Sequence, residues 1–288
     1  NVARYLIESG GKRIRPLLTL ASAGVFSDDA TPATSLAGAV EFIHSATLLH
    51  DDVVDESDQR RGKASANLVH GNAMVVLVGD FLFSRAFQLM VETGDMRILK
   101  SLSDASAIIA EGEVLQLSHI GNTSMGLPVY ERIIAAKTAA LFAAACESGA
   151  LISGASAEHA AIMKQYGHHL GMAFQMADDV MDYAADEAEM GKNLGDDFRE
   201  GKLTLPVLLA YEKDPSFWDK VMAQPHRNDD DLSQARQKIM HADALSLGSH
   251  MAGNHAQQAI LSLSQLGQNN VLVGTLSDLA QFVVERKK

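Results

Sequence analysis

DDVVD at residues 51–55 and DDVMD at residues 178–182 are two copies of one acidic pattern. Each copy places carboxylates at positions i, i+1 and i+4, so in a helix the outer two lie one turn apart on the same face. Like charges at that spacing destabilise a helix unless a cation lies between them, and oxygen ligands that leave room for water suit Mg²⁺. One copy alone is more often a solvated helix face, but two copies within apolar helical runs predict two magnesium clamps around a diphosphate.

The rest of the chain has the composition of a helical protein. Of its 288 residues 47% are hydrophobic, enough to bury a large core, and only six are proline. Long runs of Ala, Leu, Val and Met show helical spacing, and no regular series of alternating strands is present. Turn-rich breaks are short and no low-complexity linker divides the chain. We therefore expect an all-α fold in a single domain over residues 1–288.

Charge and cysteine content exclude several classes of protein. The net charge of −12 argues against binding nucleic acid or an anionic membrane surface, although bound Mg²⁺ would turn an acidic site into an anion receptor. One cysteine, Cys146, excludes a disulfide framework and fits a reducing compartment.

No uninterrupted apolar run reaches the roughly 18 residues of a spanning helix, and the best candidate, Ala73–Phe83, is interrupted by Asp80. No signal peptide is apparent. We expect a cytoplasmic protein without a transmembrane segment, and because the chain opens at Asn1 we expect native N-terminal residues to be missing.

Basic residues gather beside the acidic motifs and near the N-terminus. GGKRIRP at residues 10–16 combines glycines, whose backbone N–H groups can approach an anion, with a proline suited to the first turn of a helix. Arg60 and Arg61 follow the first acidic motif, and GKNLGDDFREGKLTLP at residues 191–206 follows the second. Any one of these cations is more often a partner in a surface ion pair. Their joint placement instead predicts binding of diphosphates.

Taken together, these motifs resemble those of the trans-isoprenyl diphosphate synthases, the polyprenyl synthetase family. The matching stretches are GGKRIRP at 10–16, DDVVDESDQRRG at 51–62, Lys137-Thr138, Phe174-Gln175, DDVMD at 178–182 and GKNLGDDFREGKLTLP at 191–206. The stretch IHSATLLHDDVVDESDQRRGKASAN at 43–67 is most similar to bacterial synthases of long chains.

The resemblance implies an isoprenoid synthase fold, with antiparallel helices around a deep central cavity, and a homodimer. It also implies repeated transfer of an allylic prenyl group from its diphosphate onto isopentenyl diphosphate, giving octaprenyl to decaprenyl diphosphate for the ubiquinone side chain. Weak membrane association would help to release so apolar a product. Three alternatives stay open: a synthase of shorter farnesyl or geranylgeranyl chains, a non-catalytic subunit of a heteromeric synthase, and a terpene cyclase.

The resemblance also assigns roles to individual residues. Magnesium, three ions per active site with substrate bound, would be held by Asp51, Asp55, Asp178 and Asp182, with Asp52 and Asp179 as supporting or alternate ligands. The catalytic group, which carries the leaving diphosphate's charge or stabilises the allylic cation, would be Lys137, Thr138, Gln175, Lys192 and Arg60. A further group would bind substrate, chiefly the second substrate, isopentenyl diphosphate. Its members would be Lys12, Arg15, His44, Arg61 and Lys202.

Chain length is expected to depend on Ala46 and Thr47, the fifth and fourth residues before the first aspartate. In the family, large aromatics there stop elongation early, so these small residues imply an open tunnel and long products. Close helix packing explains small residues equally well. Glu111, Glu113 and Gln116 are expected to have surface or packing roles, and His50 is left without a role.

Overall fold

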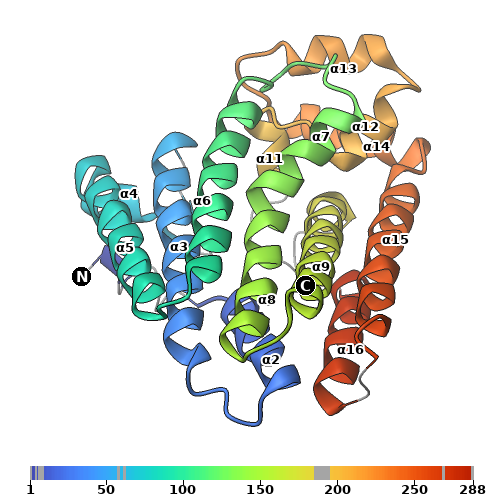
Figure 1. The fold of residues 1–288 in the computed structure, drawn as a ribbon. Coiled ribbons are helices and arrows are strands. Elements are labelled where there is room, and N and C mark those ends of the chain that lie inside the picture. The colour runs from blue at the N-terminus through green and yellow to red at the C-terminus, as the bar shows by residue number, and fades with distance from the viewer. Residues whose placement is uncertain are drawn as a thin grey trace. The chain divides into compact units, whose positions relative to one another are not determined.

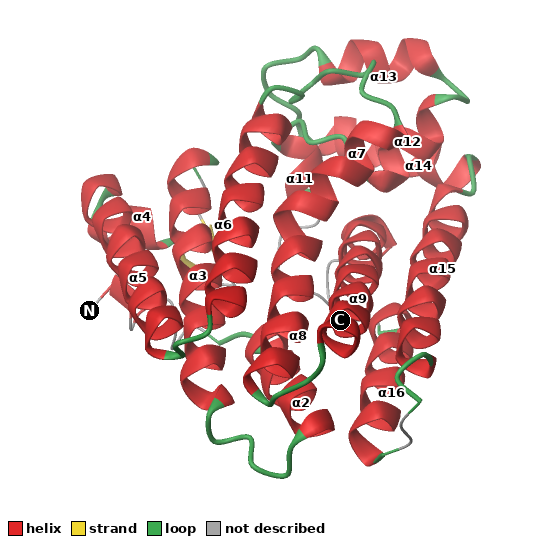
Figure 2. Ribbon diagram, viewed as in Figure 1, coloured by secondary structure: helices red, strands yellow, loops and turns green. Residues whose placement is uncertain are grey.

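The structure, a computed structural model, describes residues 2–3, 5, 10–56, 59–60, 63–184, 195–267 and 270–286. Helices dominate these residues, which confirms the all-α prediction, and a single short hairpin interrupts them (Figure 2). The helices pack into two compact units. Unit 1 comprises residues 1–106, 141–167 and 265–274, and unit 2 comprises residues 107–140, 168–264 and 275–288.

Unit 1 is built around two long helices, and the first of them ends in the first acidic motif. They are α3 (Ala33–Val54) and α5 (Asn72–Glu92), which run side by side (Figure 1). The other elements that lie wholly or partly in this unit are α2 (Ile14–Phe26), β1 (Gln59–Arg60), β2 (Lys63–Ala64), α4 (Ala66–His70), α6 (Met96–Leu117), α8 (Ala140–Ile152), α9 (Ala157–Ala184) and α16 (Val271–Glu285).

Two glycines permit the closest helix contacts in unit 1. A Cβ at Gly79 of α5 would lie 2.2 Å from Nε2 of His50, which explains why His50 of α3 can lie against α5. A Cβ at Gly149 of α8 would lie 2.3 Å from the backbone oxygen of Thr19, so α2 and α8 touch through their backbones. Such contacts leave no room for a side chain because protein interiors are close-packed.

Unit 2 holds most of α9 together with α7 (Leu127–Ile134) and its continuation η1 (Ala135–Ala139), which is a π-helix. Its remaining helices are α11 (Asp196–Arg199), α12 (Leu205–Tyr211), α13 (Pro215–Met222), α14 (Asp229–His241) and α15 (Ala244–Ser264). Local sequence explains several of their starts. Proline occupies the first turn of α7, α12 and α13, and Asn228 and Asp231 form a capping box at α14.

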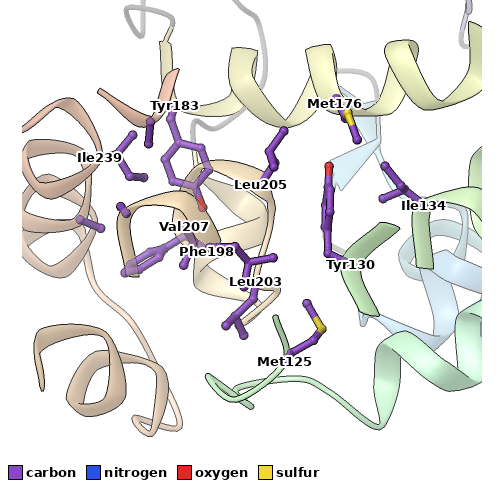
Figure 3. Close-up of a cluster of buried hydrophobic side chains, with 14 of the residues drawn as sticks. Met125, Tyr130, Ile134, Met176, Tyr183, Phe198, Leu203, Leu205, Val207 and Ile239 are labelled. Carbon is purple, nitrogen blue, oxygen red and sulfur yellow. The ribbon is translucent and has the colours of Figure 1, made fainter. Parts of the chain in front are cut away.

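The apolar core of unit 2 surrounds Phe198 and Trp218, both fully buried. Figure 3 shows Tyr130, Met176 and Leu205 approaching one another from α7, α9 and α12. This core therefore places α7 beside the half of α9 that carries the second acidic motif.

Among the residues that the structure describes, two stretches reach the length and hydropathy of a membrane span, a test that the core helices of globular proteins also pass. Residues Leu127–Ile152 have a mean hydropathy of 1.3 with 72% of the best window buried, as in a core helix. Helix α5 reaches 1.6, but only 28% of its window is buried. Its exposed apolar side chains are Met74, Val76, Leu77, Phe81, Phe87 and Val91.

Candidate active site

The first acidic motif forms the last turn of α3, and its three carboxylates face different surroundings. Asp52 is 0% exposed, and its Oδ1 accepts hydrogen bonds from Nε and Nη2 of Arg60 at 2.7 and 2.6 Å. Asp51 and Asp55 are only half-buried, and the backbone N–H of Asp55 closes the helix on the oxygen of Asp51. The middle aspartate thus holds Arg60 beside the motif, while the outer pair shares a face one turn apart.

The basic residues near the N-terminus lie against α3 in the same unit. Nη1 of Arg15 lies 3.1 Å from Nε2 of His44, and the Arg15 guanidinium lies 4.7 Å above the Phe142 ring. Two residues that the sequence assigned to one substrate are therefore in contact. Arg13 is instead paired with Glu41 on α3, which gives it a structural role.

In the second acidic motif, on α9, the middle aspartate is again the buried one. Asp179 is 3% exposed, and both of its oxygens accept hydrogen bonds. Gln175 Nε2 donates to Oδ1 at 2.8 Å, whereas Tyr130 O–H donates to Oδ2 at 2.7 Å and the backbone N–H of Leu205 lies 3.5 Å from the same atom. Burial raises the pKa of Asp179 to about 7.

The outer aspartates of this motif differ from each other. Asp178 is 39% exposed and forms an ion pair with Arg286, whose guanidinium lies 4.1 Å above the Phe174 ring. Burial, followed by the charge of Asp197, raises the pKa of Asp182 to about 8. Its Oδ1 accepts a hydrogen bond from the backbone N–H of Gly195, while its Oδ2 has no hydrogen-bond partner within the described part of the chain.

These carboxylates fit a divalent cation bound together with a phosphate-bearing ligand. A buried carboxyl with a raised pKa and an unpartnered oxygen is stabilised in its charged form by a nearby cation. Across the described ranges, no three His, Cys, Asp or Glu side chains form a metal site by themselves. Mg²⁺ usually takes one or two protein carboxylates and completes its shell with water and phosphate oxygens.

Lys137 and Thr138 lie in η1, a geometry that is uncommon and often found at functional sites. Nζ of Lys137 lies 2.5 Å from Oε2 of Glu113. Glu113 is therefore the ion-pair partner of Lys137, a role that the expected surface or packing role did not include. A Cβ at Gly112 would lie 2.5 Å from Cβ of Ala136, which explains how α6 comes so close to η1.

A cavity of about 160 Å³ in unit 2 brings several of the predicted residues together. Its lining includes Lys137, Thr138, Gln175, Asp179 and Lys202, all taken from the sequence as site residues. Thr138 O–H donates to Gln175 Oε1 at 2.8 Å, so the pair assigned to cation stabilisation is in direct contact. Asp197, from the motif at residues 191–206, also lines it, and so does Gln116, for which a surface or packing role was expected. The lining residues that the sequence did not indicate include Tyr130 and His119.

Tyr130 is a functional candidate that sequence reasoning missed. It stands seven residues before Lys137, about two helical turns, but an isolated tyrosine in an apolar helix gives no sign that its hydroxyl reaches a carboxylate. Lys202 is paired with Glu200 at 2.6 Å. Arg61 and Lys192 lie outside the described residues.

The two residues expected to set chain length are differently placed. Ala46 is fully buried in an apolar cluster of α3, α4 and α5 side chains with Val75 and Leu82. The hydroxyl of Thr47 donates to the backbone oxygen of His44 at 2.8 Å. The small size of Ala46 thus serves close helix packing, and its effect on product length remains a prediction.

Comparison with known proteins shows the family to which the chain belongs. The polyprenyl synthetase family model matches residues 1–239. The octaprenyl diphosphate synthase of Escherichia coli is 48% identical over 206 residues, covering 72% of this chain and 64% of that protein. The nonaprenyl diphosphate synthase of Rhodobacter capsulatus is 43% identical over 213 residues, covering 74% and 65%. These aligned stretches span just under two thirds of the relatives' own length.

Two solved structures are similar over the whole chain. One is a polyprenyl synthase from Caulobacter crescentus complexed with calcium and isoprenyl diphosphate, with a TM-score of 0.94, 46% identity and coverage of 100% of this chain and 88% of that one. The other is a decaprenyl diphosphate synthase from Rhodobacter capsulatus, with a TM-score of 0.93, 47% identity and coverage of 100% and 89%. Sequence motifs, all-α fold and relatives agree: the chain belongs to the polyprenyl synthetase family.

Proposed function

We propose that the protein is a Mg²⁺-dependent prenyltransferase that makes a long trans-polyprenyl diphosphate, octaprenyl to decaprenyl, by adding isopentenyl units to an allylic diphosphate primer. The observation that carries the proposal is the contact between Thr138 and Gln175 in a cavity that also contains Lys137 and Asp179. An allylic cation needs oxygen dipoles that stabilise charge without a strongly nucleophilic group. The named relatives, an octaprenyl and a nonaprenyl diphosphate synthase, support the long product.

Ionisation of the allylic substrate requires the departing diphosphate to be neutralised. When bound, Mg²⁺ would supply Lewis-acid stabilisation of that leaving group, and Asp51, Asp55, Asp178 and Asp182 would hold it, three ions per site in our proposal. Asp52 and Asp179 would support this set, since Asp52 orients Arg60 and Asp179 orients Gln175. Lys137 adds a positive charge, held in place by Glu113 until a diphosphate arrives.

Isopentenyl diphosphate would be bound by the N-terminal basic group, in which Arg15 and His44 are already in contact. An arginine presents parallel N–H donors that match phosphate oxygens. Lys12, Arg61 and Lys202 complete the proposed group. The double bond of the bound isopentenyl group then attacks the allylic cation and forms the new carbon–carbon bond. The released diphosphate accepts the proton that is lost, which restores a double bond and completes each cycle.

A second copy of the chain is the partner we propose for α5. Its exposed apolar side chains extend from Met74 to Val91 along one helix. A soluble monomer rarely leaves so continuous an apolar surface uncovered. We also propose that residues 1–288 act as one catalytic domain, supported by a family match that includes parts of both units, and that the enzyme is cytoplasmic and serves ubiquinone synthesis.

One assay tests the proposal against its alternatives. Purified protein is incubated with labelled isopentenyl diphosphate, a farnesyl or geranyl diphosphate primer and Mg²⁺, and the dephosphorylated products are separated by chromatography. Products of eight to ten isoprene units are expected. Farnesyl or geranylgeranyl products would favour the short-chain alternative. Cyclic hydrocarbon made from the primer alone would identify a cyclase, and no incorporation would contradict the proposal.

A further inference from the structure

The side chains of Thr138, Gln175, Asp179 and Tyr130 form one continuous hydrogen-bonded chain within unit 2. It runs from the Thr138 hydroxyl to Gln175 Oε1, from Gln175 Nε2 to Asp179 Oδ1, and from the Tyr130 hydroxyl to Asp179 Oδ2. Its members come from three elements, η1, α9 and α7. All four side chains line the same cavity, and Figure 3 shows the Tyr130 hydroxyl directed toward α9.

The chain determines which end of the Gln175 amide faces Thr138. A carboxylate oxygen accepts hydrogen bonds, and an amide offers N–H donors at one end and a carbonyl acceptor at the other. Asp179 Oδ1 therefore accepts a hydrogen bond from the NH₂ group of Gln175 at 2.8 Å. The carbonyl oxygen of Gln175, Oε1, then faces Thr138 and accepts its hydroxyl. A reversed amide would bring two acceptor oxygens together at Asp179 in a buried site, where an unmade hydrogen bond costs most.

Tyr130 secures this arrangement from the far side of the carboxylate. Its hydroxyl donates to Oδ2 at 2.7 Å, so that oxygen is occupied by a donor and Oδ1 remains for Gln175. The ring itself is 3% exposed and packs with the apolar core of unit 2, which restricts the hydroxyl to one position. Gln175 and Asp179 stand four residues apart on α9 and so share a face.

We propose that Tyr130 is a positioning residue for the reaction: acting through Asp179, it holds the Gln175 amide with its oxygen, rather than its N–H group, beside Thr138 and the reacting carbon of the allylic substrate. The role in catalysis rests on the proposed function, whereas the orientation of the amide does not. A reversed amide would direct N–H dipoles at a developing cation and oppose its formation.

The orientation is tested on the metal-free protein without any turnover. The side-chain amide of Gln175 is observed by NMR in protein labelled with ¹⁵N-glutamine and identified by its loss in Gln175→Leu. In Tyr130→Phe we expect changed amide shifts and solvent exchange about tenfold faster, because Asp179 loses one of its fixed donors. Unchanged shifts and exchange in a folded Tyr130→Phe protein would overturn the proposal.

The catalytic part is tested by separating turnover from binding. Tyr130→Phe is expected to lower kcat about tenfold while KM for both substrates stays within about twofold. The matched control is Tyr183→Phe, which removes another buried tyrosine hydroxyl, 2% exposed, that makes no hydrogen bond to Gln175 or Asp179 in the described part of the chain. Its kcat should stay within about twofold of wild type.

Equal kcat values for the two tyrosine variants, or a loss confined to KM, would overturn the proposal. Asp179→Asn provides a second route if Tyr130→Phe does not fold, since an asparagine can present either end to Gln175. It should lower kcat by more than tenfold relative to wild type, and a value equal to wild type would contradict the positioning role. Inactive wild-type protein would instead refute the proposed function, and the NMR result would still decide the orientation.

Discussion

Cation binding at the second acidic motif should release a proton. Burial, together with the charge of Asp197, raises the pKa of Asp182 to about 8. At pH 7 this carboxyl is therefore about nine-tenths protonated, and at pH 9 only about one-tenth. A carboxylate must be deprotonated to bind a metal. Binding of Mg²⁺ with diphosphate should accordingly release about 0.9 proton from this group at pH 7 and about 0.1 at pH 9.

Isothermal titration calorimetry measures the release directly. Mg²⁺ and diphosphate are titrated into the protein at pH 7 in two buffers of different ionisation enthalpy, and the heats give the number of protons exchanged. Asp182→Asn is the control, because it keeps every other proton source, including the diphosphate itself. Identical proton release by wild type and Asp182→Asn would refute the reasoning.

The same shift predicts how the stability of the metal-free protein depends on pH. The folded pKa lies above the ordinary value of 3.8, so the folded state binds the proton more tightly than the unfolded state does. The stabilisation is complete below about pH 4 and is lost as the pH rises through about 8. The free energy of unfolding should therefore fall over this window by up to about 1.4 kcal/mol per pH unit, as urea melts can determine. A flat profile, or one unaffected by Asp182→Asn, would contradict this.

Three further predictions concern packing, product length and metal. Gly149→Ala should destabilise the protein by about 1–3 kcal/mol, because the new Cβ would overlap the backbone of α2. Gly253→Ala is the control: no atom lies within 4 Å of its Cβ, so it should stabilise the helix by about 0.5–1 kcal/mol. Equal urea midpoints for the two variants would be inconsistent with this. Ala46→Phe should shift products to farnesyl or geranylgeranyl diphosphate with activity retained, and unchanged long products would place the tunnel wall elsewhere. Asp51→Ala and Asp178→Ala should each lower turnover by orders of magnitude, and full activity at saturating Mg²⁺ would disprove the two-clamp interpretation. Thermal melts of the metal-free protein should stay level or rise for Asp51→Ala but fall for Asp178→Ala, because that change removes the ion-pair partner of the buried Arg286.

Much of the helical architecture could be predicted from sequence, because it depends on local regularity. The acidic motifs were expected on helices, and they lie on α3 and α9. The family resemblance, carried by Lys137-Thr138 and Phe174-Gln175, assigned Thr138 and Gln175 to one step. Their direct contact then followed from the packing of η1 on α9.

Only part of the division of labour inside each acidic motif could be predicted. The spacing i, i+1 and i+4 separates the middle aspartate from the outer pair, but it does not show that Asp52 and Asp179 are the buried and hydrogen-bonded members while their neighbours remain more accessible. Which face of a helix is covered depends on the elements that pack against it. For Asp179 these are α7 and the start of α12, distant in sequence.

The sequence by itself therefore determined the helical class, the family and the chemical type of the site, because helix periodicity and motif spacing are properties of a few neighbouring residues. Only the tertiary structure decided the partners of those residues: Arg286 for Asp178, Glu113 for Lys137, and Tyr130 for Asp179. Each of these contacts joins segments far apart in the chain. Such contacts depend on close packing and on the satisfaction of buried polar groups, neither of which is a local property of sequence.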